Sequence, residues 1–239
     1  MIGPFFKYFG SKWRVSIVTP EPQHNTIVEP FAGSACYSLR HYKKDVILYE
    51  THQPVVELWR WLIYSATKQD ILDIPLTKDV PAFTPIDTLP LSKGQQLLLQ
   101  YNQRTNNNTS RTTADISHFI NGGWTAGKRA MVAQYINAIK HWQIFQLDGM
   151  TAFHHKNATY EVDPPYSLYG HKYYKQMQRL DYDMLAKHCL SMRSQVIVHE
   201  STAKDGTLPA YLPFQSFNKQ FHRNDRMTNP VKELIWTNK

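Results

Sequence analysis

The segment Thr26-Ile27-Val28-Glu29-Pro30-Phe31-Ala32-Gly33-Ser34-Ala35 combines the features that decide the fold. Its short apolar run is typical of a buried strand, the small residues after it favour a tight turn, and a helix is expected beyond that turn. This order lets a ligand approach the backbone closely. The segment has one glycine, so it is not the dinucleotide-binding fingerprint, and no Walker lysine follows it.

Further apolar runs have the same form and also lead into acidic residues. They are Val46 to Tyr49 before Glu50, Thr159 to Val162 before Asp163, and Val196 to Val198 before His199 and Glu200. Helix-like stretches lie at 54–67 and 131–141, and 231–237 reads as a closing strand. The alternation predicts an α/β fold with a Rossmann-like, doubly wound, mostly parallel sheet. Polar residues at the carboxyl ends of parallel strands are expected to line one crevice.

The stretch 68–130 breaks this alternation. Its first third holds four prolines, which disfavour a long helix and favour an extended connector. Between Leu91 and Ala130 stand five basic residues and one acidic residue, a net charge of +4 out of +8 for the whole chain. We expect a discontinuous domain, 1–67 and 131–239, with 68–130 as an inserted linker and mainly helical DNA-recognition subdomain. A solvated loop is the alternative.

Within this insertion, several side chains are candidates for nucleic-acid contacts. Arginine and lysine suit phosphates or guanine, and aromatic rings suit base stacking. The candidates are Arg104, Arg111, Lys128 and Arg129 for charge, and Tyr101 or Trp124 for stacking.

The composition of the 239-residue chain is that of a globular protein, because 42% of the residues are hydrophobic. No apolar run is long enough for a membrane span, and the N-terminus lacks the layout of a signal peptide. Cys36 and Cys189 are too few for a disulfide framework, and His154 and His155 lack metal-ligand spacing, so no metal site is expected. These features predict a soluble cytoplasmic protein. A pI of 9.3 favours a polyanionic partner such as nucleic acid.

The motif Asp163-Pro164-Pro165-Tyr166 is the strongest chemical signal. Two prolines make a stiff corner that aims a carboxylate and a backbone carbonyl at one point. Such a pair of acceptors holds both N–H groups of an exocyclic amino group, while Tyr166 offers a face for an extruded base. An ordinary turn is the alternative for the motif taken alone.

Taken together, these motifs resemble the Dam-like N6-adenine DNA methyltransferases, particularly the phage and prophage forms. Besides Asp163 to Tyr166, the resemblance rests on four segments: Lys7 to Lys12, Glu29 to Ser34 with Glu50, Val198 to Glu200 with Leu212 to Phe214, and Glu233 to Trp236. It implies a DNA-modifying enzyme, such as a restriction-modification methyltransferase, that transfers a methyl group from S-adenosylmethionine to adenine N6 in double-stranded DNA.

The resemblance also implies residue roles. The catalytic residues are Asp163, Pro164, Pro165 and Tyr166; the cofactor-binding residues are Tyr8, Lys12, Glu29, Phe31, Gly33, Ser34, Glu50 and Asp163; and Lys7 is a DNA contact. The chain departs from the family at Ala35 and Cys36, where a further glycine is usual, at Tyr8 and Ser11, which replace Trp and Gly, and at His199. The alternatives are a DNA-binding protein with a degenerate donor site and an N4-cytosine or RNA methyltransferase. Oligomeric state is open between monomer and weak dimer.

Overall fold

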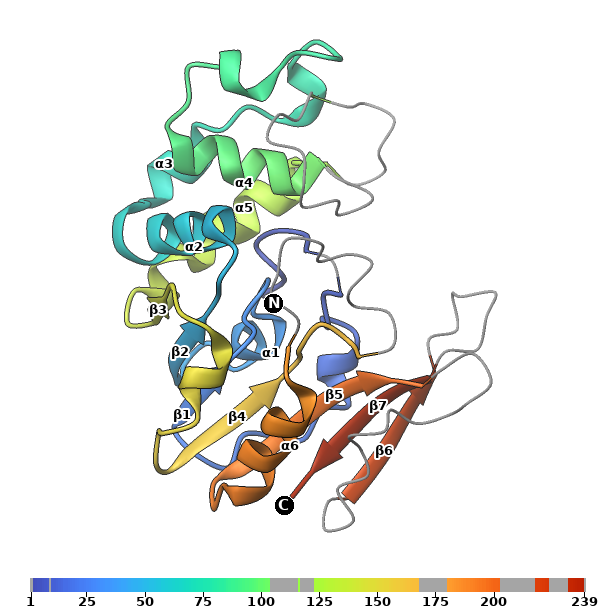
Figure 1. The fold of residues 1–239 in the computed structure, drawn as a ribbon. Coiled ribbons are helices and arrows are strands. Elements are labelled where there is room, and N and C mark those ends of the chain that lie inside the picture. The colour runs from blue at the N-terminus through green and yellow to red at the C-terminus, as the bar shows by residue number, and fades with distance from the viewer. Residues whose placement is uncertain are drawn as a thin grey trace.

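The computed structural model describes residues 2–8, 10–103, 116, 123–167, 180–202, 218–223 and 232–238, the backbone alone at 218–223 and 232–233. Its strands are β1 (Thr26–Glu29), β2 (Asp45–Tyr49), β3 (Gln143–Phe145), β4 (Ala158–Val162), β5 (Gln195–Ser201), β6 (Asn218–Arg223) and β7 (Lys232–Thr237). They form one sheet of order β3-β2-β1-β4-β5-β7-β6 (Figure 1). Strands β1 to β5 are parallel, and β7 is antiparallel to both β5 and β6. The expected α/β class is confirmed, and the mostly parallel sheet is compatible with a Rossmann-like fold.

The helices are α1 (Cys36–Arg40), α2 (Gln53–Arg60), α3 (Lys68–Leu72), α4 (Lys93–Gln103), α5 (Ala126–Tyr135) and α6 (Tyr182–Ser191), with short helical turns η1 (Val15–Ile17), η2 (Trp61–Ser65), η3 (Thr77–Asp79), η4 (Ile86–Thr88), η5 (Ile136–Ile139) and η6 (Gly149–Ala152). The two helices predicted from apolar periodicity, at 54–67 and 131–141, correspond to α2 with η2 and to the second half of α5 with η5, whereas that periodicity predicted no helix at α3, α4 or α6. Helix α5 begins before the predicted start at residue 131, because Thr125 Oγ1 caps it by accepting the N–H of Lys128 at 3.2 Å. In the described part of the chain, no helix is both long and apolar enough to cross a membrane.

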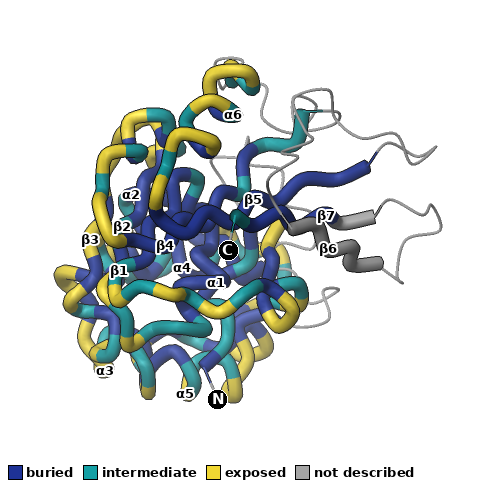
Figure 2. Tube along the Cα trace, turned by 90° about the horizontal axis from the view of Figure 1, so that it is seen from below, coloured by how far each residue is buried: buried dark blue, intermediate teal, exposed yellow. Residues whose placement is uncertain are grey.

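Both faces of the central strands β1, β4 and β5 are buried, which explains why these strands read as continuous apolar runs. Ile27 belongs to the hydrophobic core under α1 and α2, which we call the α1-side core. The next residue, Val28, belongs to the hydrophobic core under α6, which we call the α6-side core. Successive side chains of a strand point to opposite faces, so a single apolar run serves both cores. Figure 2 shows α6 and α1 on opposite sides of the sheet.

The insertion continues the α1-side core instead of forming one of its own. Helix α3 packs on α5, α4 packs on α2, and Leu98 and Trp124 are fully buried in the same cluster as Trp59 of α2. The prolines at its start allow only α3 and two short turns before α4, as predicted. The expected boundary at residue 130 falls inside α5, which therefore joins the insertion to the rest of the chain. In Figure 1 these helices lie together beyond β2 and β3.

Candidate functional site

The chain changes direction across the sheet between β1 and β4. From β1 it proceeds to β2 and β3 on one side, then returns to β4 and β5 on the other. Ligands of open α/β sheets bind at such a switch point, outside the carboxyl ends of the strands. Glu29 ends β1, Glu50 follows β2 and Asp163 follows β4, so the topology gathers three of the predicted site residues at this edge.

The loop after β1 is held closed around Gly33. The Gly33 N–H donates to Glu50 Oε2 at 3.1 Å, and its carbonyl accepts from Trp59 Nε1 at 2.8 Å. Its φ is +47°, and a Cβ at this position would lie 2.9 Å from the ring of Tyr8. The turn therefore requires glycine, and it brings Tyr8 of the N-terminal element against the β1 loop.

Glu50 is the acceptor at the end of β2. Its Oε1 accepts the N–H groups of Thr51 at 2.9 Å and His52 at 2.8 Å, in addition to the Gly33 bond on Oε2. Burial raises the pKa of Glu50, and the three N–H donors act against that rise. An ionised carboxylate has about four lone-pair positions, so Glu50 retains capacity for one further donor.

Lys12 joins the N-terminal element to the Asp-Pro-Pro-Tyr corner. Its Nζ lies 3.0 Å from Asp163 Oδ1 and 4.6 Å from the centre of the Tyr166 ring, and it donates to the Gly10 carbonyl at 2.8 Å. The Lys12 side chain is only 9% exposed, against 20% for Asp163. The ion pair fixes two segments that are 151 positions apart in the sequence at one point.

The corner itself is held by neighbours that the sequence interpretation missed. Tyr182 of α6 donates its hydroxyl hydrogen to the Pro165 carbonyl. Glu200 of β5 accepts the Ser167 N–H at 3.0 Å. Pro164 is buried, while Asp163 and Tyr166 are half-buried and thus partly accessible. The position of Glu200 after an apolar run signalled a strand end, but its bond to residue 167 depends on tertiary structure.

Glu29, Ser34 and Phe31 lie around the β1 loop but face different neighbours. Glu29 is 2% exposed, and its Oε1 accepts the Ser38 N–H at 2.9 Å. Ser34 is buried with its Oγ 3.4 Å from Cys36 Sγ, and Phe31 packs on the α6-side core. These contacts support the loop, and direct contact of the three residues with a donor stays a prediction.

Three of the residues that depart from the resembled motifs lie together, since Ser11 contacts Cys36 and Ala35 precedes Cys36, whereas His199 is buried in β5. Ala35 is buried at a left-handed φ of +45°, a conformation that costs a residue with a Cβ more than it costs glycine. Cys36 Sγ lies 3.0 Å from Ser11 Oγ, so the thiol faces the N-terminal element. Burial raises the pKa of the Cys36 thiol. Cys36 and Cys189 are both buried and free, as expected of small apolar residues.

Three residues of the insertion that were predicted to contact DNA instead pack or form hydrogen bonds within the protein. Trp124 is fully buried, with its backbone N–H donating to Thr77 Oγ1 at 2.8 Å, so the expectation that it stacks on a base is wrong. Lys128 is half-buried and donates to the Pro4 carbonyl, and burial lowers its pKa to about 8. Arg129 donates to the carbonyls of Leu72 and Ile74, each at 3.2 Å.

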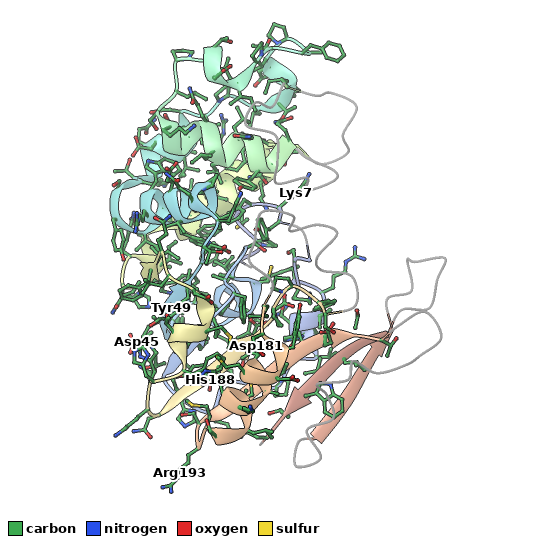
Figure 3. The ribbon with its side chains drawn as sticks, in the orientation of Figure 1. Lys7, Asp45, Tyr49, Asp181, His188 and Arg193 are labelled. Carbon is green, nitrogen blue, oxygen red and sulfur yellow. The ribbon has the colours of Figure 1, made fainter. Side chains whose placement is uncertain are left out.

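The other side chains predicted to contact DNA are Tyr101, Arg104, Arg111 and Lys7. Tyr101 is also buried, 5% exposed in α4. Arg104 and Arg111 lie outside the described residues. Lys7 is half-buried, and in Figure 3 it lies where the helices meet the sheet. Burial lowers its pKa. Contact of Lys7 with DNA stays a prediction.

Within the described ranges, no three His, Cys, Asp or Glu side chains gather in a way that suits a metal ion. The chemistry available at the switch point is that of carboxylates, one ammonium group, backbone N–H groups and aromatic faces. No protein-family model matches the chain, and no curated protein matches its sequence.

Proposed function

We propose that this chain transfers a methyl group from S-adenosylmethionine to adenine N6 in double-stranded DNA. The observation that carries the proposal is the convergence of the predicted motifs at the sheet switch point. Lys12 pairs with Asp163 at 3.0 Å, while Gly33 binds Glu50 at 3.1 Å. The segments that resemble the methyltransferase motifs are thus neighbours at the edge where α/β sheets bind ligands.

The residues present fit the donor chemically. Glu50 keeps one acceptor position beside a tight glycine turn, which suits a ribose hydroxyl group. Asp163 would supply a carboxylate to the cationic sulfonium group of a bound donor. Tyr8, Lys12, Gly33 and Ser34 would surround the methionine part. When bound, S-adenosylmethionine supplies an activated methyl group, so the chain itself has to align the reactants.

The corner would hold the acceptor base. The Asp163 carboxylate and the Pro164 carbonyl would accept the two amino N–H bonds of adenine, and Tyr166 would stack on the flipped ring. Holding both hydrogens turns the nitrogen lone pair toward the methyl group. Direct transfer needs no nucleophilic cysteine, which agrees with the burial of Cys36 and Cys189.

The test is incubation with methyl-labelled S-adenosylmethionine and unmethylated duplex DNA. The wild-type protein should label the DNA, and Asp163→Asn should label it at least about a hundredfold more slowly, because the charged acceptor is lost. Asp87→Asn, at an exposed position in η4, is the matched control and should retain the wild-type rate. Equal labelling by Asp163→Asn and wild type would overturn the proposal.

A second candidate is a DNA-binding protein without methyl transfer, favoured by the buried Ala35 at φ +45° where the family has glycine. Isothermal titration with S-adenosylmethionine separates the two. The methyltransferase binds the donor in its wild-type form and more weakly as Asp163→Ala, whereas a binding module shows no heat of binding in either form. Cytosine N4 or RNA as acceptor is distinguished by which nucleoside carries the label.

A further inference from the structure

A cluster of ionisable side chains lies in the core directly beneath the proposed transfer site. Glu29 of β1, Glu161 of β4 and His199 of β5 are 2%, 3% and 0% exposed. All three occupy the α1-side face of adjacent strands, because Ile27 and Ile197, two positions before Glu29 and His199, belong to that core. We call these three residues the buried acid cluster. The proposed function assigns no role to Glu161 or His199.

The contacts within the cluster couple its charges. His199 Nε2 lies 3.2 Å from Glu161 Oε1, within ion-pair distance, and neither ring nitrogen makes a hydrogen bond of good geometry among the described residues. Glu29 has the Ser38 N–H as its donor at 2.9 Å. Burial raises the pKa of Glu29, and the charge of Glu161 raises it further. Both influences favour the neutral form of Glu29, while Glu161 has His199 as its neighbour at 3.2 Å.

The cluster is linked to the site above it. The β4–β5 register pairs Val162 with Val198, so Asp163 and His199 are the next residues along these two neighbouring segments. Burial by itself lowers the pKa of His199, but Glu161 and, more weakly, Asp163 raise it, while Lys12 lowers it, and the net direction is upward. Because this coupling is reciprocal, a protonated His199 stabilises the charged form of Asp163 by the same amount.

The described cation that acts on His199 from another segment is Lys12. From α1, Cys36 and Tyr37 face the carboxylates, and burial raises the pKa of both, so each is neutral near pH 7. Lys12 is engaged by Asp163. Among the described residues, this leaves His199, at 3.2 Å, as the basic side chain beside Glu161.

We propose that His199 is a positioning residue of the transfer site, because its imidazolium compensates Glu161 and so keeps Asp163 ionised and paired for the incoming amino group. The role rests on the proposed function, since Asp163 is the group it serves. Loss of the His199 charge leaves an uncompensated carboxylate beneath Asp163, and the acceptor strength of the corner changes with pH.

The test compares the pH profile of kcat/KM for wild type, His199→Gln, and the double variant His199→Gln/Glu161→Gln. His199→Gln should lower kcat/KM near pH 7 by about fivefold or more, the usual size of a coupling between two sites, and remove the alkaline limb due to His199. The double variant removes both charges and should recover most of the rate. His154→Gln, an exposed histidine, is the control and should keep the wild-type profile.

Two outcomes contradict the proposal. One is an unchanged pH profile in His199→Gln after correction for folded fraction, which indicates a purely structural role. The other is a double variant no better than the single one. If no variant transfers methyl groups, the proposed function fails, but an NMR titration still tests the pairing. The His199 ring must titrate at a lower pH in Glu161→Gln than in wild type, and an equal titration midpoint overturns the inference.

Discussion

Replacement of Glu29 by glutamine should make the protein more stable than wild type as the pH rises. Glu29 is 2% exposed and adjacent to Glu161, and burial followed by the charge of Glu161 raises its pKa above the ordinary 4.5. Between that value and the folded-state pKa, the folded protein holds a proton that the unfolded chain has released. Wild-type stability therefore falls as pH rises through this window. Glutamine keeps an acceptor for the Ser38 N–H and does not titrate.

The magnitude follows from proton linkage. One proton of difference changes the free energy of unfolding by about 1.4 kcal/mol per pH unit, so the gap between Glu29→Gln and wild type should widen at up to this slope. Urea denaturation between about pH 5 and about pH 8 measures the difference in unfolding free energy between the two proteins. The dependence of that free energy on urea concentration should be the same for both. Asp87→Asn is the control, since Asp87 is exposed in η4. Parallel stability curves for Glu29→Gln and wild type would refute the reasoning, and a gap that narrows with pH would show Glu29 ionised and paired.

Two other predictions concern packing and charge. Gly149→Ala places a Cβ 2.1 Å from the Pro30 carbonyl oxygen and should lower the free energy of unfolding by about 1–3 kcal/mol. Gly127→Ala places a Cβ with no atom within 4 Å and should raise the free energy of unfolding by about 0.5–1 kcal/mol. Thermal or urea unfolding that ranks the two variants in the opposite order would contradict this packing. Neutralising Arg104 should flatten the salt dependence of DNA affinity by about one unit of slope, while Arg129→Gln should leave the slope unchanged and lower stability. Equal salt slopes for the two variants would show that Arg104 does not contact a DNA phosphate.

The sheet was predictable from sequence because burial on both faces produces continuous apolar runs. The acidic residues after β1, β2 and β4 were also predictable as neighbours, since the carboxyl ends of parallel strands meet at one edge. Strand β3 has only three residues, two of them exposed, so it carries no periodic signal. The sequence interpretation also missed α6, which has only two fully buried apolar positions, Leu185 and Cys189.

The side-chain roles in the insertion were not predictable from composition. Trp124 and Arg129 stand in a basic, turn-rich stretch that favours solvent exposure, yet one fills the core and the other binds the carbonyls of Leu72 and Ile74. A buried tryptophan and an arginine bound to backbone carbonyls have the same sequence pattern as a nucleic-acid contact. The partnership of His199 with Glu161 was hidden for a similar reason, since it joins two strands whose register is set by the whole sheet.

The central claim is that the Asp163 corner methylates adenine N6 in DNA. Its most direct test is nucleoside analysis by mass spectrometry, after duplex DNA has been incubated with the wild-type protein and S-adenosylmethionine and then digested. The proposed function predicts N6-methyladenosine in the deoxy form, absent with Asp163→Asn. N4-methylcytosine, label confined to RNA, or no methylated nucleoside from a folded protein would contradict it.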